Sequence, residues 1–335
     1  MSDPELPEAL RDELRASWHR YLDLVAPLRP ALHGYCRRLT GDVWDGEDLV
    51  QDTLVRAFAT LGAVHHDIRN PRAYLLRTAT HVWIDALRRR RSEQASLAAQ
   101  ASVAERAQPL PPSDELRDAG ALLLHRLSPQ ERAAVVLKDL FDMELEEIAE
   151  VLRTSVGAVK AALHRGRGRL RDPEEKVAAQ RARPSVELVD RFVALYNAKD
   201  VNGLIALMLD SGSVENVGSS LEYGHENFPR RDGWFQHAVF GHDEWPAEFH
   251  YESARLERAL LAGEPVALGF AVRRGREALE QVLRFEEEDG RIARLRGYSF
   301  CPETMREVGA ELGLRVRGRL YRYPSPAPGK LWTKP

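Results

Sequence analysis

The stretch that decides the fold is DGEDLVQDTLVRAFATLGAVHHDIRNPRAYLLRTATHVWIDALRRRR, residues 45–91. It predicts two long helices joined by a polar turn, because apolar residues recur at helical spacing in each half. The first helix is expected to begin near Asp45, where a carboxylate can cap free backbone N–H groups. The second is expected to begin at Asn70, a favourable N-cap, with Pro71 at the first helical position.

Residues 17–92 around this stretch predict a small all-α bundle, followed by an Ala-, Ser-, Gln- and Pro-rich linker at 93–113. Residues 114–172 predict a second helical domain. Within it, Ser128 and Glu131 form a capping-box pattern ahead of a helix-turn-helix. Its second helix, from Ser155 onward, belongs to a segment that carries several cations and no carboxylate, and such a helix suits DNA phosphates.

Both predicted helical domains contain sequence motifs that are typical of one family. GEDLVQDTLVRAF and NPRAYLLRTATHVWIDALRRRR resemble region two of the sigma-70 family, in its extracytoplasmic-function (ECF) branch. LSPQERAAVVLKDLFDMELEEIAEVL and SVGAVKAALHRGRGRL resemble region four of the same branch. The resemblance implies a sigma factor that binds core RNA polymerase and directs promoter-specific transcription initiation.

The resemblance also assigns residues to partners. The acidic face of the first helix is expected to bind core polymerase, through Asp48, Gln51 and Asp52. Contact with the minus-ten promoter element is expected from the loop and the second helix, through His65, His66, Asn70, Arg72, Arg77, Arg88, Arg89 and Arg90. Contact with the minus-thirty-five element is expected from the helix-turn-helix, through Ser155, Ala158, Lys160, Arg165 and Arg167. Trp83 suits the core and a base-stacking surface about equally.

A third domain is expected at residues 185–300, after a charged linker at 173–184. Two helical segments precede several strand-like segments there, which predicts an antiparallel meander after the helices. The EDG turn ending at Gly290 predicts a hairpin. This order resembles the cone-shaped α+β fold of the SnoaL-like (nuclear transport factor 2-like) family, which implies a cavity that a small-molecule ligand could enter. The candidate lining residues are Tyr223, Trp234, His237 and Trp245. Residues 301–335 are expected to form a helix from Pro302 to Leu312 and then a tail.

Composition narrows the functional classes. The 335 residues are 44% hydrophobic and 30% charged, as in soluble globular proteins. No apolar run approaches the roughly 20 residues that a membrane span needs, and the acidic N-terminus lacks the pattern of a signal peptide. A cytoplasmic protein without membrane contact is therefore expected. Cys36 and Cys301 fall in different predicted domains, which disfavours a disulfide or a cysteine metal site.

No catalytic motif, metal-ligand spacing or phosphate loop is found, so no catalytic residue, metal or cofactor is predicted and an enzyme is not expected. The C-terminal domain is instead expected to regulate the sigma domains. One alternative is a ligand-binding or enzymatic SnoaL-like protein whose DNA-binding half is secondary. Another is a one-component repressor with a helix-turn-helix. The region-two motifs within residues 45–91 disfavour this alternative.

Overall fold

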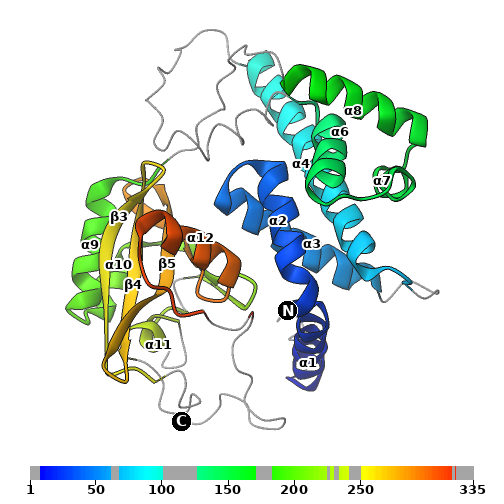
Figure 1. Cartoon of the computed structure of the whole chain (residues 1–335). Coiled ribbons are helices and arrows are strands. Elements are labelled where there is room, and N and C mark those ends of the chain that lie inside the picture. Colours follow the sequence, from blue (N-terminus) through cyan, green and yellow to red (C-terminus); the bar gives the residue numbers. More distant parts are fainter. Residues whose placement is uncertain are drawn as a thin grey trace, which may run out of the picture. The chain divides into compact units, whose positions relative to one another are not determined.

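The computed structural model describes residues 8–61, 68–100, 127–170, 183–224, 227–229, 234–240, 250–318 and 321. The chain divides into two compact units, residues 1–179 and 180–335, and each has its own hydrophobic core (Figure 1). Within the described ranges, no helix has the length and apolar character that crossing a membrane requires.

The described part of the first unit is all-α. Its elements are α1 (Glu8–Val25), the 3-10 turn η1 (Ala26–Leu28), α2 (Arg29–Thr40), α3 (Val43–Leu61), α4 (Pro71–Gln100), α6 (Pro129–Val135), the π-helical turn η2 (Val136–Leu140), α7 (Leu145–Leu152) and α8 (Val156–Leu170). The predicted all-α class of this half is confirmed.

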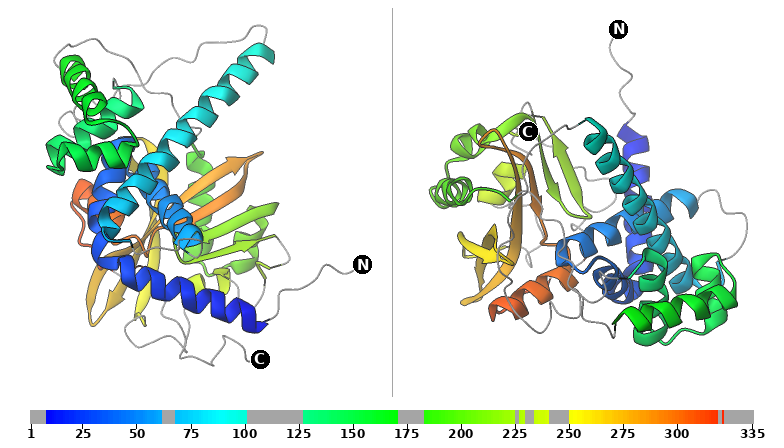
Figure 2. Two further views of the ribbon diagram at one scale, coloured as in Figure 1. Left: turned by 90° about the vertical axis from the view of Figure 1, so that its right-hand side faces the viewer. Right: turned by 90° about the horizontal axis from the view of Figure 1, so that it is seen from above.

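The starts of α3 and α4 show how capping residues in the sequence set helix boundaries in the first unit. α3 begins two residues earlier than expected, because Asp42 Oδ1 accepts hydrogen bonds from the backbone N of Trp44 and Asp45, both at 2.9 Å. α4 begins as expected, with Asn70 Oδ1 accepting from the backbone N of Ala73 at 3.0 Å. α4 continues to Gln100, past the expected end at residue 92, and is the long helix of Figure 2.

The core of the first unit joins the apolar faces of α1–α4 with those of α6–α8. Tyr35 on α2 and Leu76 on α4 are almost completely buried, as are Leu137 on η2 and Ile148 on α7. Trp83 is only 5% exposed, so in this structure it belongs to the core.

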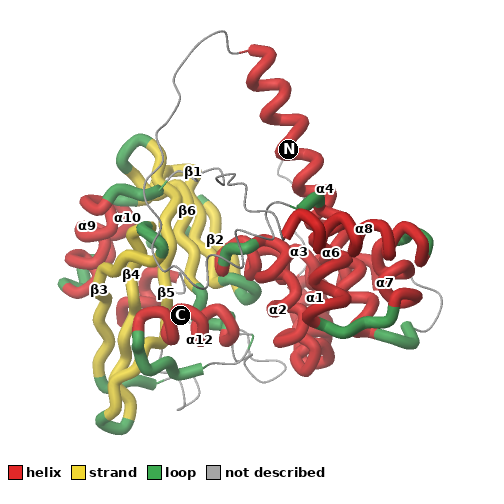
Figure 3. The backbone as a smooth tube through the Cα atoms, turned by 45° about the horizontal axis from the view of Figure 1, so that its top comes forward, coloured by secondary structure: helices red, strands yellow, loops and turns green. Residues whose placement is uncertain are grey.

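The second unit combines helices with one sheet, which confirms the α+β class (Figure 3). The described helices are α9 (Val186–Asn197), α10 (Val201–Ala206), α11 (Trp234–Phe240) and α12 (Pro302–Leu312). The described strands are β1 (Met208–Asn216), β2 (Ser220–Tyr223), β3 (Ser253–Leu261), β4 (Glu264–Arg273), β5 (Arg276–Glu288) and β6 (Arg291–Gly297), which pair in the order β2-β1-β6-β5-β4-β3.

The sheet is a meander with one departure from the expected pattern. β3 to β6 pair antiparallel in sequence order, and the turn through Asp289 and Gly290, with φ of 50° and 72°, closes the predicted hairpin. β1 pairs with β6 in parallel, where an all-antiparallel meander was expected. α9 packs on β3 and β4, and α12, with the predicted bounds, packs on β5 (Figure 1).

Candidate nucleic-acid interface

A helix-turn-helix of the first unit presents the candidate DNA-binding surface. α7 ends at Leu152, and its C-cap residue Arg153, with a φ of 49°, turns the chain toward α8. Ser155 Oγ accepts from the backbone N of Ala158 at 3.1 Å and so caps the start of α8. Ser155, Ala158 and Lys160 are exposed on this helix, as a recognition helix requires.

A groove of about 500 Å³ runs beside this helix. It is lined by Lys138, Leu145, Lys160, Leu163, His164, Arg167 and Gly168. Three permanent cations and a histidine therefore converge on one concave surface, and such a surface attracts a phosphate backbone. Lys160 and Arg167 were predicted from the sequence, whereas Lys138 and His164 were not. Lys138 comes from η2, a helical turn before the helix-turn-helix, and only the folded chain brings it to α8.

The arginines of α8 are held by carboxylates on α6 and η2. Arg165 Nε donates to Glu131 Oε1 at 3.1 Å, and Arg169 also binds Glu131. Arg167 Nε donates to Asp139 Oδ2 at 3.1 Å. Arg165 thus has a structural partner in addition to its predicted role at DNA, while about half of its side chain stays exposed.

Glu131 is the anchor of this arrangement. Its side chain is 3% exposed and completes the predicted capping box, accepting from the backbone N of Ser128 at 3.0 Å. Burial alone would raise the pKa of this carboxyl, but the hydrogen bonds from Ser128 and Arg165 and the charge of Arg169 hold the pKa below its usual value. Gly166 lets α8 pack closely against α6, because a Cβ at this position would lie 3.0 Å from the Val135 side chain.

The acidic surface assigned to core polymerase lies on α3. Asp52 is exposed, and Asp48 and Gln51 are half-buried. Gln51 Nε2 donates to Glu47 Oε1 at 2.6 Å, and Glu47 is fully buried against Arg29. The ion pair with Arg29 holds Glu47 in place, and Glu47 in turn binds Gln51 of the acidic surface. Asp52 is the most exposed carboxylate of that surface.

The residues assigned to the minus-ten element are spread along and before α4. Asn70, Arg72, Arg88 and Arg89 are exposed, and Arg77 is half-buried. His65 and His66, and the side chain of Arg90, lie outside the described residues.

The middle of α4 is covered by the helix-turn-helix domain. Arg77 forms an ion pair of 3.5 Å with Glu150, and the Arg132 guanidinium lies 5.3 Å from the Trp83 ring centre. Burial, followed by the positive charge of Arg153, lowers the pKa of His81.

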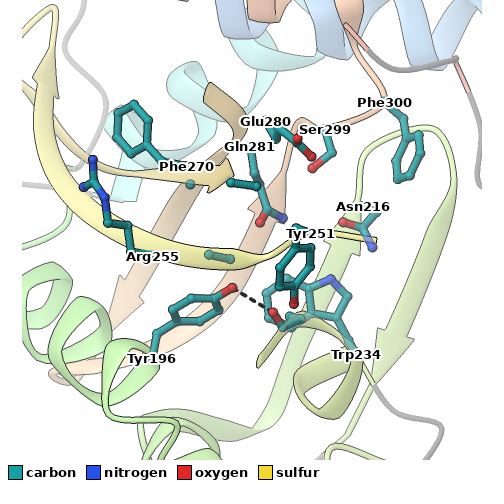
Figure 4. Close-up of a pocket in the computed structure, with 14 residues that line it drawn as sticks. Tyr196, Asn216, Trp234, Tyr251, Arg255, Phe270, Glu280, Gln281, Ser299 and Phe300 are labelled. Atoms are coloured by element: carbon teal, nitrogen blue, oxygen red, sulfur yellow. Dashed lines mark hydrogen bonds between the residues drawn. The ribbon is translucent and has the colours of Figure 1, made fainter. Parts of the chain in front are cut away.

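The second unit contains a cavity of about 70 Å³. Figure 4 shows residues that line it, among them the polar Asn216, Gln281 and Ser299 and the aromatic Tyr251 and Trp234. Trp234, a candidate from the sequence, is one of the lining residues.

Of the other candidate lining residues of the second unit, only Tyr223 has a described side chain. Tyr223 lies on β2, is 62% exposed, and is not among the residues that line the cavity. The side chain of His237, and Trp245, lie outside the described residues. Within the part of the chain that the structure describes, no group of three or more His, Cys, Asp or Glu side chains is placed to hold a metal ion.

Comparison with known proteins agrees with both helical regions. Residues 24–93 match the family "Sigma-70 region 2", and residues 121–170 match "Sigma-70, region 4". The ECF RNA polymerase sigma factor SigG of Mycobacterium tuberculosis is 28% identical over 290 residues, covering 76% of this chain and 74% of SigG. The RNA polymerase sigma-E factor of Streptomyces avermitilis is 33% identical over 167 residues, covering 46% of this chain and 84% of that protein.

Among solved structures, the crystal structure of the M. tuberculosis ECF sigma factor SigJ matches with a TM-score of 0.31 and 24% identity, covering 81% of this chain and 94% of SigJ. The family assignment rests on the sequence matches to the two sigma regions and to the Streptomyces relative, most of whose length is covered. The chain therefore belongs to the ECF branch of the sigma-70 family of RNA polymerase sigma factors.

Proposed function

We propose that this sigma factor binds core RNA polymerase through the acidic face of α3 and places α8 in the major groove of the minus-thirty-five element. α4 and the loop before it then contact the minus-ten element. The observation that supports this most strongly is the groove beside α8, where Lys138, Lys160 and Arg167 converge next to an exposed recognition helix. The chain carries out no chemistry of its own.

Each promoter contact is small, and specificity comes from joining them. Residues 93–113 are proposed to link the two promoter-binding domains. Once both domains are bound to one polymerase, binding of one domain to its promoter element raises the effective concentration of the other domain at the second element. Weak individual contacts then suffice for a specific complex.

The second unit is proposed to regulate this activity through a ligand in its cavity. Asn216 and Ser299 are almost fully buried there, and Gln281 also lines the cavity. Such a lining suits a small neutral molecule that exchanges hydrogen bonds with amide and hydroxyl groups. Glu280, also in the lining, is bound by Arg273 and Arg317, so it is proposed to hold the fold rather than to transfer protons.

Run-off transcription with purified core polymerase and the DNA upstream of this gene tests the proposal. The full chain and a variant that ends at Arg183 are compared side by side. Promoter-dependent transcript from either supports the sigma function, and the ratio of the two gives the sign of the C-terminal control. No transcript from either, with no binding to core polymerase, would refute the proposal.

A further inference from the structure

A buried ion pair lies next to the acidic surface of α3. Glu47 on α3 is fully buried and binds Arg29 of α2, which is 2% exposed. His33, one turn further along α2, is also buried and places its Nε2 3.8 Å from Glu47 Oε2. None of these side chains reaches the surface, so none of them can contact polymerase itself.

Stability alone does not account for the pair of Arg29 and Glu47. Removing two charges from water is costly, and apolar side chains of similar volume are often equally stabilising or better at such positions. A buried pair has its best use where it fixes a conformation that an apolar contact would leave free. A side chain next to the pair is therefore expected to need one defined orientation.

That side chain is Gln51, one helical turn after Glu47 on α3. Its Nε2 donates to Glu47 Oε1 at 2.6 Å. A carboxylate that faces a guanidinium is ionised and can only accept hydrogen bonds. The NH2 group of Gln51, and not its carbonyl, must therefore face Glu47. Because the amide is planar, the carbonyl Oε1 points away from Glu47, and no group among the described residues donates to it.

The orientation of Gln51 makes this face of α3 a surface of hydrogen-bond acceptors. Asp48 and Asp52 share the face with Gln51, since they lie three residues before it and one after it on the helix. We propose that Glu47, held by Arg29, is a positioning residue for polymerase binding, which keeps the carbonyl of Gln51 turned outward. Core polymerase then needs donors, such as arginine or lysine side chains, opposite this face. This inference rests on the proposed function, which assigns the face to polymerase.

Fixing Gln51 in advance strengthens the complex for two reasons. A free glutamine rotates about several side-chain bonds, and ordering such a side chain in an interface weakens binding about three- to tenfold. A free amide can also turn its NH2 group outward, where it would meet the donors of the partner. Glu47 excludes that orientation, so the donors of polymerase find an acceptor that is already in place.

The first test replaces the pair by apolar residues, as Arg29→Met with Glu47→Leu in the full chain. This pair variant leaves neither charge buried without its partner, so the helical bundle should still fold. A merely structural role of the pair is then satisfied, and only the positioning of Gln51 is lost. Thr80→Val is the matched control, because it removes a buried hydrogen bond of 2.7 Å between Tyr35 of α2 and Thr80 of α4 in the same bundle.

Affinity for core polymerase is the first measurement. The pair variant should bind about three- to tenfold more weakly than the wild type, whereas Thr80→Val should bind like the wild type. In a chain that already carries Gln51→Met, replacing the pair should cause no further loss, because both changes then act through one contact.

The second measurement follows the Gln51 amide without polymerase. In the full chain labelled with 15N-glutamine, its side-chain signal is identified by its absence in Gln51→Met. Its NH2 protons should exchange with solvent more slowly than those of the exposed Gln130 on α6, and the pair variant should abolish this difference. The wild-type exchange rate decides the orientation even if the pair variant does not fold.

Exchange of the Gln51 amide as fast as that of Gln130 would overturn the proposal, and so would wild-type affinity in a folded pair variant. A loss of affinity that persists undiminished in the Gln51→Met chain would also overturn it, since the pair would then act elsewhere. If Asp52→Arg abolishes polymerase binding and the pair variant binds normally, the positioning role alone is wrong. If Asp52→Arg retains binding, the error lies in the proposed function, and the inference falls with it.

Discussion

Removal of the Lys160 charge should change how DNA binding depends on salt. Lys160 is exposed on α8, lines the groove, and has no ion pair among the residues that the structure describes. Lys160→Ala therefore removes one cation without freeing a carboxylate, and alanine keeps the helix. Each phosphate contact contributes about 0.9 to the slope of log affinity against log salt. From 50 to 200 mM salt, this makes the advantage of the wild type shrink by about 3.5-fold.

The assay is binding of the holoenzyme to duplex DNA from upstream of this gene, at four or more salt concentrations. Because the difference between two slopes is measured, contacts of the polymerase itself cancel. Arg291→Ala is the control, since it removes one exposed cation from β6 in the second unit. Parallel lines for Lys160→Ala and the wild type would refute the reasoning, because a residue at a phosphate must change the slope as well as the affinity.

Three further predictions concern the first unit. Glu131→Ala should lower its stability by about 2 kcal/mol, from a lost cap of about 1 kcal/mol and two half-exposed ion pairs. This corresponds to a melting temperature about 4–8 °C lower, and Glu131→Gln should lose less; equal melting of Glu131→Ala and wild type in calorimetry would contradict this. Because the pKa of folded His81 lies below 6.5, the unfolded state binds more protons between that pKa and 6.5, so the free energy of unfolding should fall as pH drops through this window. His81→Gln should remove that dependence of the urea midpoint, and an unchanged pH profile would exclude His81 as its source. Asp52→Arg should abolish co-purification with core polymerase without changing the far-UV circular dichroism, whereas Glu13→Arg on α1 should not; retained binding would move the contact elsewhere.

Local signals in the sequence predicted much of the fold. Asn70 before Pro71 marked the start of α4, and the Ser128–Glu131 pattern marked the start of α6. The bounds of α12 and the turn at Gly290 were also confirmed. Each of these depends on a few neighbouring residues, whose backbone preferences are strong enough to be read without the rest of the chain.

Features that depend on distant residues were not predicted. Lys138 reaches the groove only because the π-helical turn and the bend at Arg153 bring it beside α8. Trp83 is buried in the core beside Arg132, which lies about fifty residues further along the chain. The parallel pairing of β1 with β6 likewise joins segments that no local pattern connects. The assigned contacts with polymerase and DNA remain predictions.

The parallel pairing of β1 with β6 has a consequence for synthesis on the ribosome. Val214 of β1 pairs with Leu295 of β6, about eighty residues later, so β1 cannot join the meander until β6 has emerged. The helices of the first unit pack largely through nearer neighbours and are synthesised earlier, and contacts of this kind form faster. During each round of translation, the sigma domains are therefore expected to fold while the sheet of the second unit is still incomplete. A nascent chain would pass through an interval in which this sigma factor is not yet subject to its own C-terminal regulation.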